Sequence, residues 1–599
     1  MRTRPCLPKS LVPALALMAL LFITLPTAHA VNYTVGAAGG GCGYTTIAAA
    51  ITAAEAQTSG SRPVIYIATN QSYDAQALSI SAKSMSLIGG VPNCSTHTPA
   101  GNTTITGGNS AAVITLRNMA AGTQIILSHL TITGGHGNSG GGIDYIGSGA
   151  MNIDNASINS NQATDGGGIH FGGNGTTAAE LYLHSNTFVT NNTANGGSGG
   201  GLRADGQANV HIDEDQIWFY NNHADSGSGG GLIVVGPAYA HIGSPGYKIT
   251  SYIGVMYENR ALNGGGIAAI SGHGGVAQVD IFATDSNNPV RVEQNRAYSK
   301  GGGIYLIPYI QFEPGYSADA AINLGGAQID DNAAPEGSAV YSDVDSAAGI
   351  YTGGDVSLYA GHCAAGLECN SMSNNRAIDS SNNPTAGSTL LVQTNGSLRA
   401  RELTMRGNEG AHAIRVVDGL SNLGLTLDTC LLAENTVTAE LVTTGHAAAT
   451  ISQWTMAGNS IGGSSVMYAE TGFTMTNSII TQGSLASLHY LGTGAGRTID
   501  YVMAQETASL SLGGTHLFNA DPLFVDAGNG NFRLRADSDA IDVAPAGAAG
   551  DTDLEHRPRD VDMSNVPNLD GVRDLGAYER QLPSCNADDS IFCDGFDSN

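Results

Sequence analysis

Short apolar stretches separated by clusters of glycine, asparagine and serine dominate the pattern of hydrophobic and polar positions along this chain. Representative stretches are Ala111–Leu116 and Gln124–Leu127. Short runs of this kind, rich in β-branched residues and bounded by turn residues, are typical of β-strands, and helical spacing at i, i+3 and i+4 is almost absent. The pattern therefore predicts an all-β protein built from many short strands.

A glycine motif, Gly-Gly-Gly followed by isoleucine or leucine, recurs along the chain at intervals of 26 to 37 residues. It begins at Gly140, Gly166, Gly199, Gly229, Gly264 and Gly301, and a degenerate form begins at Gly337. A period in this range indicates a solenoid, a propeller or another repeat array. Glycine suits the motif because sharp turns between strands need positive φ angles.

A second motif, an apolar residue followed by two variable residues and asparagine, runs in phase with the glycines. Its asparagines are Asn161, Asn192, Asn222, Asn259, Asn295, Asn332, Asn375, Asn408, Asn435 and Asn459. Equivalent residues of stacked parallel strands lie about 4.8 Å apart, so these side chains can hydrogen-bond along the stack and satisfy buried turn groups. We predict a parallel β-helix with an asparagine ladder; a propeller, which needs antiparallel blades of steadier length, fits less well.

One segment has helical spacing. Thr45–Gln57 places Ile47, Ile51 and Ala54 on one face, which predicts a short capping helix over the first coil. About 15 coils would follow and form a rod about 70 Å long. We expect a signal peptide (1–30), the cap and first coils (31–100), β-helix repeats (101–510), a closing module (511–580) and a cysteine-containing tail (581–599).

The paired glycine and asparagine motifs resemble the repeats of polymorphic outer-membrane proteins and of related proteins in the pectate-lyase-like superfamily. This resemblance covers roughly residues 100–480 and implies an all-β, right-handed, single-stranded parallel β-helix. It also raises an enzymatic alternative, because the superfamily includes polysaccharide lyases and polygalacturonases. Gly272-His273-Gly274 and the pair Asp330-Asp331 match polygalacturonase motifs, but the aspartates follow the histidine instead of preceding it.

The C-terminal region resembles the choice-of-anchor Q module of secreted bacterial β-helix proteins. The matching segments, in order, are Asp521–Phe524, Asn531–Leu534, Ser538–Asp542 and Asp574–Glu579. Asn531 and Asp539 depart from the usual aspartate and proline. The final Ile591–Asp597 resembles an Asp-Gly-Phe-Glu tail found on exported proteins of some Gram-negative bacteria.

The N-terminus has the order of a secretory signal peptide: a basic start, an apolar stretch over Leu11–Leu25 and small residues around Ala28–Ala30. Removing its three basic residues would take the formal charge from −27 to −30. A surface this acidic repels nucleic acid and anionic membranes. We expect a monomer without a membrane span, either secreted or on the outer surface of a Gram-negative bacterium.

Seven cysteines would remain after export, where disulfides are permitted. Their spacing suggests three pairs, although connectivity cannot be deduced from sequence. The suggested pairs are Cys42–Cys94, Cys363–Cys369 and Cys585–Cys593, and Cys430 would occupy an apolar strand position.

Stacking the repeats suggests one catalytic alternative. Glu258 and Asp331 directly precede ladder asparagines two coils apart, about 9.6 Å at the strand spacing, and Glu293 and Asp330 lie one position earlier in their coils. That separation is at the upper edge for an inverting glycosidase, and the same carboxylates could hold Ca²⁺. An ordinary surface network, with Arg260 and Arg296 neutralising the acids, is the preferred interpretation.

Aromatic insertions are the other surface feature. One contains Tyr305, Tyr309, Phe312 and Tyr316, and another contains Tyr239, Tyr247 and Tyr252. Exposed rings would offer sugars and proteins a flat apolar face, but burial against the coil is equally compatible. Strand alternation would also place His211, Asp213 and Asp215 on one face, more simply as an exposed strand than as a metal site.

The sequence thus favours a rod that acts by binding or adhesion, with a polysaccharide or a cell-surface molecule as ligand and no resident cofactor. The alternative is an extracellular polysaccharide lyase or glycoside hydrolase using Glu258, Glu293, Asp330 and Asp331.

Overall fold

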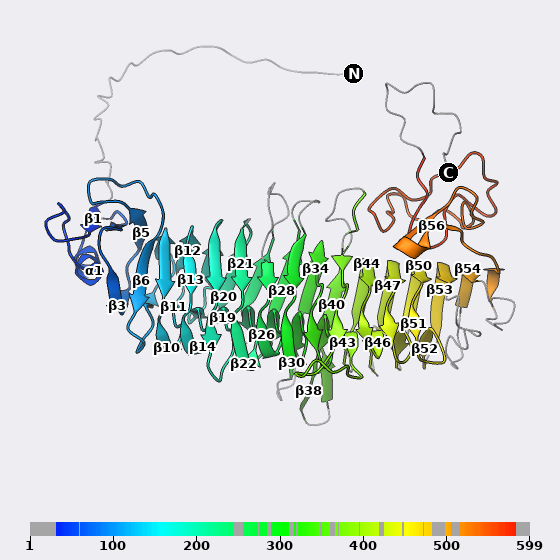
Figure 1. The fold of residues 1–599 in the computed structure, drawn as a ribbon, viewed down its shortest axis with the longest axis horizontal. Coiled ribbons are helices and arrows are strands. Elements are labelled where there is room, and N and C mark those ends of the chain that lie inside the picture. The colour runs from blue at the N-terminus through cyan, green and yellow to red at the C-terminus, as the bar shows by residue number, and fades with distance from the viewer. Residues whose placement is uncertain are drawn as a thin grey trace, which may run out of the picture.

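The computed structural model describes residues 31–58, 60–214, 216–243, 255–272, 275–283, 289–310, 317–318, 321–347, 350–359, 366–368, 370–393, 396–417, 424–445, 449–470, 472–481, 498–504 and 514–582. In this part the chain winds into a right-handed parallel β-helix, and successive coils follow one another along a rod (Figure 1). The predicted Cys363, Cys369, Cys585 and Cys593 lie outside the described residues.

A typical coil in the middle of the rod contributes strands to three parallel sheets. A representative coil runs through β11 (Ile143–Gly147), β12 (Ala150–Asp154), β13 (Ser157–Asn159) and β14 (Gln162–Asp165). We call the 13-stranded sheet containing β11 sheet I, the 27-stranded sheet containing β12 and β13 sheet II, and the 11-stranded sheet containing β14 sheet III. Sheet II bends between β12 and β13, where Asn155 has a φ of 47°, so we distinguish its IIa face (β12) from its IIb face (β13).

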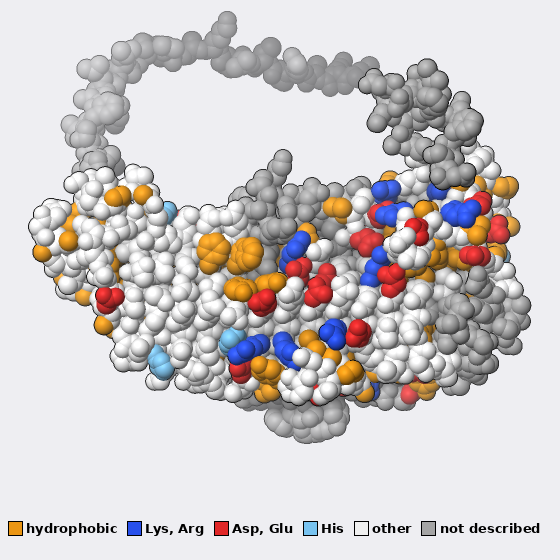
Figure 2. All heavy atoms as spheres, in the orientation of Figure 1, with side chains coloured by type: hydrophobic (Ala, Val, Ile, Leu, Met, Phe, Trp, Pro, Cys, Tyr) orange, Lys and Arg blue, Asp and Glu red, His pale blue; other side chains and the backbone are white. Residues whose placement is uncertain are grey.

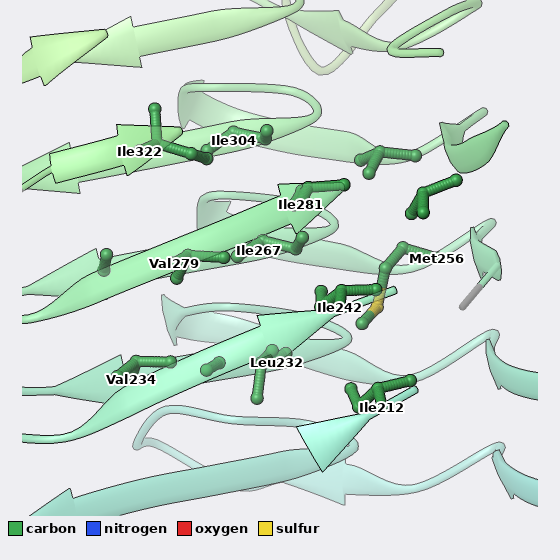
Figure 3. Packing of buried hydrophobic residues seen from close by; sticks show 14 of the residues in the cluster. Ile212, Leu232, Val234, Ile242, Met256, Ile267, Val279, Ile281, Ile304 and Ile322 are labelled. Carbon is green, nitrogen blue, oxygen red and sulfur yellow. The ribbon is translucent and has the colours of Figure 1, made fainter. Parts of the chain in front are cut away.

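The core is a set of aliphatic columns inside the rod. One column stacks Leu183, Ile212, Ile242, Ile281 and Leu324, which pair in register from coil to coil and are all 0–1% exposed. Figure 3 shows the same packing around Ile242 and Met256. Each buried side chain of this size contributes about 1.5–3 kcal/mol of hydrophobic stabilisation relative to an exposed one, so the column explains why the inward face of these strands is apolar.

The asparagine ladder is continuous from Asn161 to Asn459. At a typical rung, the backbone N–H and the Nδ2 of Asn192 both donate to Oδ1 of Asn222, each at 3.0 Å. The Nδ2 of Asn192 also donates to the carbonyl of Ile158 at 2.9 Å. The ladder thus satisfies turn groups that are buried from water.

The glycine motif forms the turn between sheet III and sheet I. Gly166 has a φ of 61°, a conformation that glycine adopts without a steric penalty. A Cβ on Gly168 would lie 2.6 Å from the carbonyl oxygen of Gly201 and 2.8 Å from the Nδ2 of Asn192. The third glycine is therefore needed because the ladder and the next coil leave no room for a side chain.

The N-terminal cap is helix α1 (Ile47–Glu55), as the sequence predicts. The Oγ1 of Thr46 accepts a hydrogen bond from the N–H of Ala49, and the face containing Ile47 and Ile51 is buried against the first strands. A disulfide joins Cys42 and Cys94 beside this cap. Among the described residues, no helix is long and apolar enough to cross a membrane.

The C-terminal segment, described over residues 514–582, adds one more parallel strand to sheet II, β55 (Thr515–Phe518), and then packs along the flank of the last coils (Figure 1). Phe532 and Ala577 lie against Leu431 and Ala457 on the outer IIb face, and the N–H of Ala577 donates to Oγ1 of Thr455. This segment covers the C-terminal part of the IIb face and leaves earlier coils of that face uncovered by it.

Candidate functional site

The uncovered part of the IIb face carries a line of aromatic side chains followed by acids. Phe188 in β17 (Thr187–Thr190) pairs with Trp218 in β21 (Ile217–Tyr220), and Tyr220 pairs with Tyr257 in β25 (Val255–Tyr257). Tyr257 in turn pairs with Glu293 in the next coil. We call Phe188, Trp218, Tyr220 and Tyr257 the aromatic strip.

Local strand geometry explains why these rings point outward. Side chains alternate along a strand, and the buried Val189 and Phe219 occupy the inward positions between them. Phe188 is 37% exposed, and the three other rings are half-buried. The Tyr220 and Tyr257 rings stack with centroids 5.7 Å apart and planes inclined by 19°. The strip is therefore an aromatic surface spanning three coils, in which the Tyr220 and Tyr257 rings face each other.

The strip's C-terminal neighbour is the acidic group, defined as Glu258, Glu293, Asp330 and Asp331. Figure 2 shows exposed hydrophobic side chains gathered in the middle of this face, with acidic side chains beside them toward the C-terminal end. Glu293 ends β29 (Val290–Glu293), and Asp330 follows β35 (Ala327–Gln328) in the next coil. The sequence-predicted acids therefore lie in adjacent coils on one face, directly beside the aromatic strip.

Glu293 and Asp330 both lie in partly desolvated positions. Burial raises the pKa of Glu293, the adjacent Arg291 opposes this at 3.6 Å, and the charges of Asp330 and Asp331 add to it. Burial also raises the pKa of Asp330, although its Oδ1 accepts hydrogen bonds from Oγ of Ser371 and the N–H of Ser373, each at 2.7 Å. Each of these two carboxyls is thus held in place by a neighbouring polar group.

Glu258 and Asp331 occupy a different kind of position, at the corner before the ladder asparagine. Their φ angles are 51° and 56°, and Asn191 and Asn221 have the same left-handed conformation in earlier coils. Both acids are exposed, and Gln294 lies between them in the stack. A hydrogen bond to the Glu258 carboxylate raises the pKa of Tyr220, which ties this acid to the aromatic strip.

The expectation that Arg260 and Arg296 neutralise these acids is wrong. Both arginines begin strands of sheet III, around the corner from the IIb face. Arg260 forms an ion pair with Asp225 at 3.0 Å, and Arg296 donates to the backbone carbonyl of Asp379 at 2.8 Å. The corner turns these side chains away, so Arg291 is the basic residue paired within the acidic group.

The tyrosines of the predicted aromatic insertions that the structure describes lie outside the aromatic strip. Tyr305 lies on sheet I and is 3% exposed, and its hydroxyl donates to Oδ2 of Asp343 at 2.8 Å. Tyr239 is half-buried on the IIa face and donates to Asp280 at 2.9 Å. Phe312, Tyr316, Tyr247, Tyr252 and the side chain of Tyr309 lie outside the described residues.

The described part of the IIa face carries histidine–carboxylate pairs. His211 lies 2.8 Å from Glu180, and His241 lies 2.8 Å from Asp213, each pair joining different coils. The remaining residue of the predicted His211 set, Asp215, lies outside the described residues. Within the described part of the chain, no group of three or more histidine, cysteine, aspartate or glutamate side chains is placed to hold a metal ion.

A buried charged network on sheet I escaped the sequence analysis. His170 contacts Asp144 at 2.8 Å and Asp205 at 3.3 Å, while Arg117 pairs with Asp144 and Arg203 pairs with Asp205 at 2.8 Å. Burial opposes the imidazolium charge, but the hydrogen bonds and charges of the two aspartates outweigh it and raise the pKa of His170 to about 9. Arg117 and Asp144 also line a neighbouring cavity of about 520 Å³.

One sequence signal could have located the aromatic strip. Tyr220, Tyr257, Glu293 and Asp330 all stand two positions before a ladder asparagine, and Phe188 and Trp218 stand four positions before one. Since the asparagines define the register of every coil, equal offsets predict equal places on the rod. Asp144, His170 and Arg203 likewise share one offset after the glycine motif, and they lie in one row of sheet I.

No family model matches this chain, and no curated protein shows significant similarity to it.

Proposed function

We propose that this protein is a secreted or cell-surface β-helix rod that binds a polysaccharide along the aromatic strip. The observation that carries the proposal is a set of outward-facing rings on three successive coils, in which Phe188 pairs in register with Trp218 and Tyr220 pairs in register with Tyr257. The apolar faces of pyranose rings pack against flat aromatic surfaces of this kind, and tyrosine and tryptophan also supply polar edges. An extended chain could lie across several coils at once.

The setting also supports this proposal. The signal-like N-terminus, the acidic composition and the resemblance to secreted pectate-lyase-like β-helices are all typical of an extracellular protein. Binding is favoured over catalysis because Glu293 and Asp330, the two acids with a raised pKa, have structural partners. Asp330 accepts two hydrogen bonds at 2.7 Å and Glu293 is paired with Arg291, whereas Glu258 and Asp331 occupy left-handed corner positions.

One observation favours a second candidate, a polysaccharide hydrolase or lyase. Burial raises the pKa of both Glu293 and Asp330, and a carboxyl with a raised pKa beside a sugar-binding surface is suited to general acid catalysis. The double variant Glu293→Gln/Asp330→Asn would remove this chemistry, and Glu258→Gln/Asp331→Asn would test the pair at the corner.

The deciding experiment measures binding and turnover on a panel of neutral, acidic and amino polysaccharides, with and without Ca²⁺. We expect binding to at least one polymer, its loss in Trp218→Ala/Tyr257→Ala, and its retention in Tyr468→Ala. Tyr468 is a matched control because it is 39% exposed on sheet I, away from the strip. Binding to none of the polymers would overturn the proposal. New reducing ends or unsaturated products that vanish in either acid variant would establish the enzymatic alternative.

A further inference from the structure

We infer that the aromatic strip and the acidic group together recognise a polysaccharide carrying free amino groups. This inference rests on the proposed function, because it names the ligand class of the same surface. The charge of the surface favours a cationic ligand. Four carboxyls flank the strip, and Arg291 is the basic side chain paired among them. A uronic acid polymer would bring like charges to this surface and be repelled, whereas an ammonium group would be attracted.

The aromatic rings of the strip also favour a ligand that carries a positive charge. A cation placed over the face of tryptophan or tyrosine is attracted by the ring's negative face, at distances up to about 6 Å from the centroid. Trp218, Tyr220 and Tyr257 lie on the same face of the rod as the carboxylates, so an ammonium group bound by a carboxylate would lie close to aromatic rings while the rest of the sugar packs on their apolar surface. Uncharged sugars would gain only the apolar contact.

The spacing of the coils also suits a polysaccharide that lies along the rod. Tyr257, Glu293 and Asp330 occupy equivalent positions in three successive coils, so Tyr257 and Asp330 are separated by about 9.6 Å along the rod. A chain lying along the rod could therefore stack one sugar on Tyr257 while an amino group on a following sugar reaches Glu293 or Asp330. Burial is the main cause of the raised pKa of Glu293, and the charges of Asp330 and Asp331 add to it; an ammonium group there would offset this added like-charge repulsion.

The test uses the full chain and three soluble hexamers: β-1,4-linked glucosamine, its fully N-acetylated form, and galacturonate. Trp218 gives a direct signal, because the only other tryptophan in the chain, Trp454, is fully buried. At a pH that keeps the amines protonated, we expect the glucosamine hexamer to shift Trp218 fluorescence and bind about tenfold more tightly than the acetylated hexamer. We expect the galacturonate hexamer not to bind.

Two double variants distinguish specific recognition of the amino hexamer at the strip from a general attraction of this cationic sugar to an acidic protein. Glu293→Gln/Asp330→Asn should abolish the preference for the amino hexamer while retaining weak binding of the acetylated one. Asp74→Asn/Asp539→Asn removes the same number of charges from exposed sites away from the strip and should change neither. Circular dichroism would establish that both variants are folded.

The outcomes distinguish the two proposals. Equal affinity for the amino and acetylated hexamers, or an equal loss in both double variants, would overturn the inference and leave polysaccharide binding intact. Tighter binding of galacturonate would also overturn the inference. No binding of any sugar would remove both proposals.

Discussion

The Nδ1 of His170 lies 2.8 Å from Oδ1 of Asp144, the residue that occupies the same position in the preceding coil. On its other side, Nε2 lies 3.3 Å from Oδ2 of Asp205. The ring is thus held between two carboxylates on the outer side of sheet I, with only 7% of the residue exposed. An imidazolium donates from both nitrogens, so this geometry stabilises the charged form.

The first prediction concerns pH. The folded-state pKa of His170 is about 9, against an ordinary value of 6.5, so folding takes up a proton. The stabilisation, on the order of 3 kcal/mol, is fully present below about pH 6.5 and is lost as pH rises through about 9. Urea unfolding of the native protein and of His170→Asn across this window should show their difference shrinking with rising pH. A difference that stays constant would contradict the assignment.

The second prediction concerns the asparagine ladder. Asn259→Ala would remove the acceptor of two hydrogen bonds from Asn222 and leave both donors buried. Each unsatisfied buried donor costs about 1–3 kcal/mol, so for two donors we expect a loss of about 2–6 kcal/mol in the free energy of unfolding. The control is Asn159→Ala, whose half-buried Nδ2 donates to Ser157 on the same strand. Equal effects of the two substitutions would argue against a special role for the ladder.

The third prediction concerns the two tryptophans. Trp218 is half-buried on the outer IIb face, and Trp454 is fully buried in the last coils. Acrylamide should therefore quench a single fraction of the native emission, and Trp218→Phe should abolish that quenching. Persistent quenching in the variant would show that Trp454 is accessible and that the packing of the last coils differs from the structure.

The fourth prediction concerns the N-terminal cap. The disulfide between Cys42 and Cys94 spans a sequence separation of 52 residues, and closing a loop of this length stabilises the folded state by about 4 kcal/mol in the chain-entropy view. Because coils of a solenoid contact mainly their neighbours, Cys42→Ala/Cys94→Ala should increase hydrogen exchange in α1 and β2 (Val64–Ala68) before any change in the middle coils. Uniformly faster exchange along the rod would contradict local capping.

Much of the fold was predictable because its requirements are local. The residue before each ladder asparagine must adopt a left-handed conformation, and the first motif glycine needs a positive φ. Asn192 stands where the buried polar groups of a turn need hydrogen-bond partners. These needs select residue types that recur visibly in the sequence. The acidic group was also found this way, since Glu293 and Asp330 share an offset from their asparagines.

The sequence could not show which outward-facing side chains are exposed to solvent. Tyr305 and Phe188 both lie on strands, yet Tyr305 is 3% exposed and Phe188 is 37% exposed. Exposure of an outward side chain depends on which insertion or module covers that coil, and nothing in the local pattern specifies this. For the same reason, Arg260 and Arg296 stand close to the acidic group in sequence but turn onto a different sheet.

The sequence by itself determined the repeat, the ladder, the capping helix and the set of acids, because each depends on a residue type at a defined point of one coil. The tertiary structure alone decided which charges meet and which rings remain open. His170 meets Asp144 across 26 residues and Asp205 across 35, and these separations change with every loop. Partners between coils are brought together by strand register, and register is a property of the whole stack.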